Sequence, residues 1–152
     1  MKKTVHPLAG GVAILMIATF WLSTAISELS GSKPFVVFVK TLIPWGFIIL
    51  IPALAAVGGT GFTLSGGRSG GLLGKKRKRM PIIAANGVLI LIPSALFLAA
   101  KAKAGDFDAT FYAVQMVELA AGAVNLWLLT KNALDGRKLT ARRRWAARRE
   151  VS

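Results

Sequence analysis

The chain has 152 residues, of which 54% are hydrophobic and only 17% are charged. A soluble domain of this length carries about a quarter charged residues, and the mean hydropathy here is +0.58. The apolar residues stand in four long runs with the charges between them. This pattern excludes an ordinary soluble domain, a disordered chain and a collagen-like chain. The lack of cysteine excludes disulfides, thiolate metal sites and a cysteine nucleophile.

The four apolar runs predict four transmembrane helices at about 8–29, 34–57, 81–100 and 109–130. Each run has about the 20 residues that a helix needs to cross a hydrocarbon core of ~30 Å. Helices follow because unpaired backbone groups are too costly in lipid. The predicted fold class is therefore an all-α integral membrane protein, with a four-helix transmembrane domain over residues 1–132.

The connections predict how these helices are arranged. The segments 30–33 and 101–108 are short, so we expect two antiparallel helix hairpins. The segment 58–80 holds eight glycines and ends in a basic cluster, which favours a flexible linker. Helix four is expected to continue past Asn132 into a basic tail, 133–152, that is either interfacial or disordered.

The distribution of Lys and Arg predicts the orientation. Sixteen of the 20 basic residues lie before the first run, between runs two and three, or after run four. Four crossings place these three segments on one side of the membrane, which the positive-inside rule makes the cytoplasmic side. Both termini are thus expected in the cytoplasm, and the membrane is expected to be a bacterial cytoplasmic membrane.

The same basic segments predict contact with anionic lipid, at ~1 kcal/mol per residue near the surface. We favour this partner over nucleic acid, because the tail has one tryptophan and no other aromatic residue. The expected lipid contacts are Lys75, Lys76, Arg77, Lys78, Arg79, Arg142, Arg143 and Arg144.

Polar residues inside the fourth run indicate an intramembrane site. Gln115, Glu118 and Asn125 fall on one helix face, and Asn86 of the third run is expected to bond across the bundle to Asn125. Glu118 lies about 14 Å into its helix. We expect it to face the bundle interior uncharged, because no basic residue is expected at matching depth. It is either a ligand or proton site, or a structural hydrogen-bonding group.

Lys40 is the basic residue inside the second run, close to the outer surface. We expect it to pair with Glu28 of the first run, or to extend its ammonium group to that surface.

His6 and Met80 are candidate haem ligands, since both residue types can bind haem iron. His6 is the one histidine of the chain, so bis-histidine ligation of haem b would require a symmetric dimer. The alternative is an interfacial His-Pro sequence that begins a helix.

Three functions remain open. We favour a non-enzymatic accessory, anchor or assembly subunit, in a homo-oligomer or a larger membrane complex. The first alternative is a haem- or quinone-binding electron-transfer protein that uses His6. The second is a small proton-coupled transporter built on Glu118. Catalysis is disfavoured, since Glu118 is the one deep acidic residue and His6 lies about 20 Å from it along the axis.

The predicted topology is tested by reporter fusions. Fusions at Ser32 and Gly105 should report an external location and a fusion at Ser69 an internal one, because the basic segments stay in the cytoplasm. An external signal at Ser69 would overturn the orientation.

Overall fold

The computed structural model is all-helical and describes residues 2–65 and 71–149, with the side chains of residues 4–61, 78–138 and 141. Helix α1 covers Lys2–Leu29 and α2 covers Lys33–Ser65. The third span is built from α3 (Gly71–Asn86), the π-helical turn η1 (Gly87–Leu91) and α4 (Ile92–Ala104). Helix α5 covers Ala109–Arg149.

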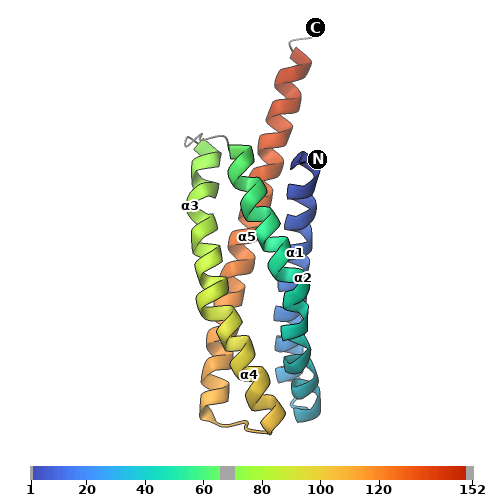
Figure 1. The fold of residues 1–152 in the computed structure, drawn as a ribbon, viewed down its shortest axis with the longest axis vertical. Coiled ribbons are helices and arrows are strands. Elements are labelled where there is room, and N and C mark those ends of the chain that lie inside the picture. The colour runs from blue at the N-terminus through green and yellow to red at the C-terminus, as the bar shows by residue number, and fades with distance from the viewer. Residues whose placement is uncertain (1, 66–70, 150–152) are drawn as a thin grey trace.

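Four helices of the described residues are long and apolar enough to cross a membrane: Thr4–Leu29, Lys33–Gly61, Lys78–Ala104 and Ala109–Lys138. This confirms the predicted all-α class and its four spans, and it fits a small membrane protein. Successive spans run up and down the bundle, so that both chain termini lie at one end (Figure 1).

The helices are longer than the apolar runs predicted. Helix α2 continues to Ser65 and α3 begins at Gly71, so most of the glycine-rich segment expected as a linker is helical. The hydrophobic pattern locates only the apolar part of a helix, whereas the backbone hydrogen bonds of the helix can continue beyond that part. Helix α5 likewise continues through the basic tail to Arg149.

Tight turns join the spans at the other end. Gly31 has a φ of +65° and Gly105 a φ of +76°, which a side chain would disfavour. Asp108 then caps α5, because its carboxylate accepts the Phe111 N–H at 2.9 Å. The Lys101 ammonium bonded to Asp108 holds the pKa of that carboxyl well below its usual range. The stabilisation that this contact provides is therefore complete above about pH 4, the pKa of an unfolded aspartate. It is lost only as the pH falls through the lower pKa of the folded state.

Proline shapes the third span. Pro93 has no N–H, and the turn before it widens into η1, where the Ile92 N–H bonds to the Gly87 carbonyl five residues back. In contrast, α2 remains one helix through Pro44 and Pro52.

The helices do not all contact one another to the same extent. Helix α1 packs against α2 and α5, α2 packs against α4, and α3, η1 and α4 pack against α5. The main buried cluster draws on α1, α2, α3 and α5, and comprises Ala13, Ile17, Leu50, Ile83, Leu128 and Leu129. A second cluster near the short turns comprises Val36, Leu98, Ala102 and Phe111.

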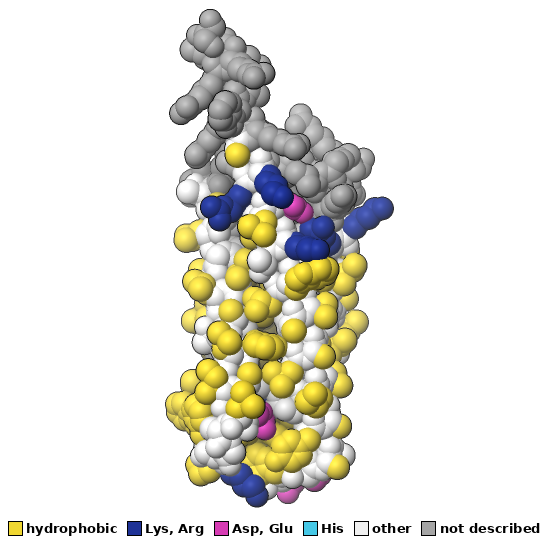
Figure 2. Space-filling model, turned by 180° about the vertical axis from the view of Figure 1, so that it is seen from behind, with side chains coloured by type: hydrophobic (Ala, Val, Ile, Leu, Met, Phe, Trp, Pro, Cys, Tyr) yellow, Lys and Arg dark blue, Asp and Glu magenta, His cyan; other side chains and the backbone are white. Residues whose placement is uncertain are grey.

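The outer surface is apolar along most of its length. On the face shown in Figure 2, hydrophobic side chains cover the bundle between two ends that carry the Lys and Arg side chains. Leu15, Ile48, Leu89 and Met116 are each about two-thirds exposed. Such a continuous apolar surface would be a liability in water, and it matches the solvent that a membrane provides.

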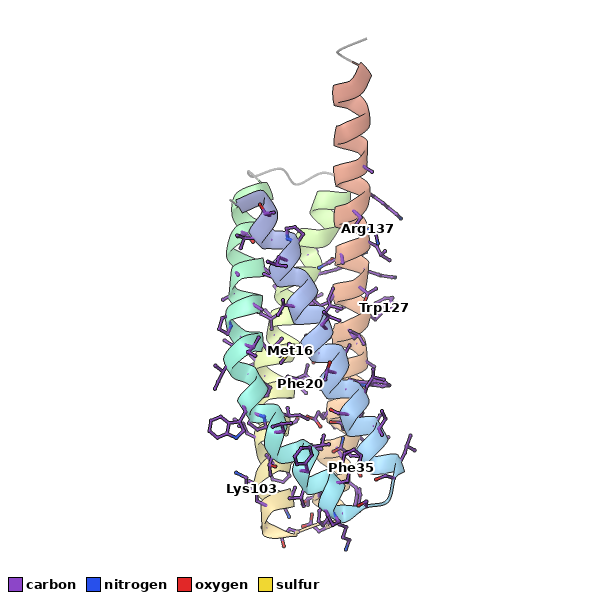
Figure 3. The ribbon with its side chains drawn as sticks, turned by 90° about the vertical axis from the view of Figure 1, so that its right-hand side faces the viewer. Met16, Phe20, Phe35, Lys103, Trp127 and Arg137 are labelled. Atoms are coloured by element: carbon purple, nitrogen blue, oxygen red, sulfur yellow. The ribbon has the colours of Figure 1, made fainter. Side chains whose placement is uncertain are left out.

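Helices α1 and α2 are tightly packed at Gly46. A Cβ at this position would overlap the Phe20 ring and lie 3.2 Å from Met16 Cε. Figure 3 shows Met16 and Phe20 at this interface, whereas Trp127 points away from the bundle. Phe20 also packs edge-on against Phe47, at 6.2 Å between ring centroids, so its ring has little room to move.

Gly46→Ala should destabilise the fold by about 1–3 kcal/mol, because the added methyl group overpacks this contact. The matched control is Gly58→Ala in the same helix, where no atom lies within 4 Å of the new Cβ. The control should be neutral or slightly stabilising, since alanine is the better helix former. Thermal unfolding in detergent measures both variants. Equal melting temperatures would contradict the close packing, and Phe20→Leu should rescue Gly46→Ala.

Candidate functional site

A buried ion pair links α2 and α5. The Lys40 ammonium lies 2.5 Å from Glu118 Oε2, and the two side chains are 1% and 12% exposed. The ammonium also donates to Thr24 Oγ1 of α1 at 3.4 Å. Gln115 Nε2, one turn before Glu118, donates to the same carboxylate oxygen at 3.4 Å. Three of the four spans therefore meet at this charge pair.

This pair corrects two expectations from the sequence. Glu118 does face the bundle interior, but the expectation that no basic residue reaches its depth is wrong. Lys40 neither extends to the surface nor takes Glu28 as its ion-pair partner. Helices α2 and α5 both start at the end with the short turns, and Lys40 and Glu118 lie seven and nine residues into them. That difference is about 3 Å along the axis, which a lysine side chain covers.

Further acceptors surround the pair. Glu28 interacts electrostatically with both Lys40 and Glu118. Its Oε1 and the Oε1 of Gln115 are buried, with no hydrogen-bond donor among the residues that the structure describes. The cluster thus carries one buried cation, two carboxyl groups and a spare amide oxygen. The Lys40 and Glu118 charges neutralise each other, and the unpaired oxygens of Glu28 and Gln115 can accept further hydrogen bonds.

Two other polar side chains attach their helices to α5. Trp21 of α1 donates its indole N–H to the Leu119 carbonyl at 2.9 Å. Asn86 of α3 donates to the Ala121 carbonyl at 2.8 Å, so it does not bond to Asn125 as the sequence suggested. Asn125 is 1% exposed, and its Oδ1 has no donor among the described residues.

A cavity of about 460 Å³ lies beside this cluster, within the usual size range of ligand sites of ~300–1,000 Å³. All four spans contribute to its wall, which is almost entirely apolar. Its polar members are Thr24, Glu118 and Asn125. Along α2 the wall runs from Ile43 to Ala55, which is about 18 Å at 1.5 Å per residue. The cavity is therefore elongated along the bundle axis.

The cavity reaches the surface between α2 and the third span. Four of its wall residues are exposed: Ile51 and Ala55 on α2, Ala84 on α3 and Val88 on η1. All four lie inside apolar spans. The rim is thus uncharged, and the opening lies within the apolar stretch of the bundle. The cavity was missed in the sequence, because it arises where α2 packs on α4 while α3 and η1 pack on α5.

The two candidate haem ligands make protein contacts. His6 Nδ1 lies 2.9 Å from Thr60 Oγ1 of α2. Met80 packs against the main buried cluster, and its sulfur accepts a hydrogen bond from Asn132 at 3.4 Å. Within the described residues there is no group of three or more His, Asp or Glu side chains that could hold a metal ion.

The basic residues expected to bind lipid are described in part. Arg79 forms an ion pair with Asp135 of α5 at 2.8 Å, and Lys78 is exposed. The side chains of Lys75–Arg77 and Arg142–Arg144 lie outside the described residues. Arg137 and Lys103 mark the two opposite ends of the bundle in Figure 3.

No protein-family model matches the chain, and no curated protein or solved structure is significantly similar to it. The site therefore has to be interpreted from its own geometry. That geometry combines a self-neutralising ion pair, buried amide acceptors and a cavity that opens between apolar helix faces.

Removing one partner of the ion pair should cost more than removing both. Lys40→Met leaves the Glu118 carboxylate without its cation and should destabilise the fold by about 3–5 kcal/mol. Lys40→Met combined with Glu118→Gln removes both charges and should recover most of that loss. Lys101→Met breaks the exposed pair with Asp108 and should cost at most ~1 kcal/mol.

Denaturant titration in detergent micelles measures these differences as a double-mutant cycle. Additive losses from the two single variants would show that the two charges do not stabilise each other.

Proposed function

We propose that this chain is a small, non-enzymatic accessory protein of a bacterial cytoplasmic membrane that binds one lipid-soluble molecule among its helices. The observation that carries this proposal is the cavity bordered by Thr24, Glu118 and Asn125, with its uncharged opening toward lipid. A binding site of this kind takes its ligand from the membrane and needs no catalytic group.

The proposal includes the orientation predicted from the charges. The spans form two antiparallel hairpins, α1 with α2 and the third span with α5, and both termini lie in the cytoplasm. The basic excess at the terminal end supports this orientation. Anionic lipid binds this end, so association with acidic nanodiscs should weaken at high salt. The protein works as a homo-oligomer or within a larger membrane complex.

A proton-coupled carrier is the second candidate, because Glu118 borders the cavity. Lys40 already neutralises Glu118, so a carrier would have to separate a buried pair in each cycle, which is costly. Proteoliposome flux abolished by Glu118→Gln would favour the carrier. The haem alternative has less geometric support, since His6 Nδ1 and Met80 Sδ make the contacts described above. A Soret band lost in His6→Ala would favour it.

The binding function is tested by blocking the opening. Ala84→Phe places a ring at the rim and should keep part of the ligand's hydrocarbon chain out of the cavity. Each ligand CH₂ that is no longer buried costs ~0.8 kcal/mol. The amount of lipid-soluble molecules that copurify with the protein should therefore fall at least about tenfold. Mass spectrometry of the extracted ligand measures this amount. The matched control is Ala85→Phe, since Ala85 is exposed but does not line the cavity.

Equal amounts of copurified molecules in the Ala84→Phe and Ala85→Phe variants would overturn the cavity as the binding site. Thermal unfolding of both variants checks that the folds remain comparable.

A further inference from the structure

The cavity wall carries an amide oxygen that lacks a donor. Asn125 lines the cavity and is 1% exposed, and its Oδ1 is buried without a hydrogen-bond donor among the described residues. Native proteins pair nearly all such groups, so this oxygen is available to a donor on a bound molecule.

The π-helical turn next to Asn125 leaves one backbone carbonyl, that of Val88, without its usual helical donor. In an α-helix the Val88 carbonyl would accept from the Ile92 N–H, but this N–H bonds to Gly87 in η1. In a π-helix the donor would come from position 93, which is proline and has no N–H. Val88 lines the cavity. A Cβ on the preceding Gly87 would lie 3.8 Å from Asn125 Nδ2, so Asn125 packs directly on this turn.

These two acceptors define the hydrogen-bonding character of the ligand. Because both groups accept, the ligand must donate, and an alcohol or phenol O–H does so without carrying charge. A charged head group is disfavoured, because the rim residues Ile51, Ala55, Ala84 and Val88 are all apolar.

The shape of the cavity defines the remainder of the ligand. The wall is elongated by about 18 Å along the axis and is apolar apart from its three polar members. A linear hydrocarbon chain fits such a space. The opening lies inside the spans, so the ligand enters from the hydrocarbon region of the bilayer rather than from its headgroup layer.

We propose that the cavity binds a neutral, hydroxyl-bearing lipid with a long hydrocarbon chain, and that its O–H donates to Asn125 Oδ1. This proposal rests on the proposed binding function and names its ligand class. Two membrane constituents share this chemistry: a polyprenol, and an isoprenoid hydroquinone.

The test measures probe binding to the full chain in nanodiscs of neutral phosphatidylcholine, titrated by the mole fraction of probe. The probes are a polyprenol, its methyl ether, an isoprenoid hydroquinone and its oxidised quinone. Each pair shares one chain and differs in the O–H. We expect the hydroxyl form of at least one pair to bind about tenfold more tightly than its partner. The pair that shows this preference identifies the source.

Asn125→Leu should remove the preference for the hydroxyl form while binding of the methyl ether or quinone stays unchanged. Asn132→Leu is the matched control: Asn132 lies two turns further along α5, is buried and does not line the cavity. It should keep the preference.

Equal binding of both members of each pair would overturn the hydroxyl proposal and leave the binding function in place. Binding of none of the four probes would overturn both. A preference that persists in Asn125→Leu and equals that of Asn132→Leu would overturn the role of Asn125.

Discussion

The fold depends on pairing a lysine and a glutamate away from water. An isolated charge at this depth would cost at least ~2.5 kcal/mol, so Lys40 and Glu118 constrain where α2 and α5 can lie. Their contact at 2.5 Å fixes the rotation of both helices about their axes. Thr24 and Gln115 complete the pair from α1 and α5. Helix α2, held against α5 by this ion pair, packs against α4 in the third span.

The cavity follows from the same constraint. Pro93 and the π-helical turn before it separate the third span into a part that packs with α2 and α5 and a part that packs mainly with α5. The cavity lies where α2 and α3 are not closely packed. Gly46, by contrast, allows α1 and α2 to approach closely. One side of the bundle is thus tightly packed, and the other has a ligand-sized opening.

The spans and their class could be predicted from the sequence, because hydrophobicity alone decides which segments cross a membrane. The face of α5 that holds Gln115, Glu118 and Asn125 could be predicted as well, because it depends only on helical spacing. The ion pair could also be predicted, because Lys40 and Glu118 lie at similar depths when both are counted from the end with the short turns. The acceptor of the Asn86 hydrogen bond could not be predicted, since Ala121 offers a backbone carbonyl that no side-chain pattern reveals. The cavity is a property of unequal helix packing and leaves no trace in any single helix.

The separation of 78 residues between Lys40 and Glu118 has a consequence for biogenesis. Helix α2 leaves the ribosome well before α5, and at ~5–20 residues per second the interval is about 4–16 s. During this time Lys40 has no carboxylate from α5, and its flexible side chain can extend toward the end of the bundle with the short turns from a position seven residues into the helix. Arrival of Glu118 then draws the ammonium inward. Helix α5 therefore completes the electrostatics of α2, and these four spans pack fully only after α5 has been inserted.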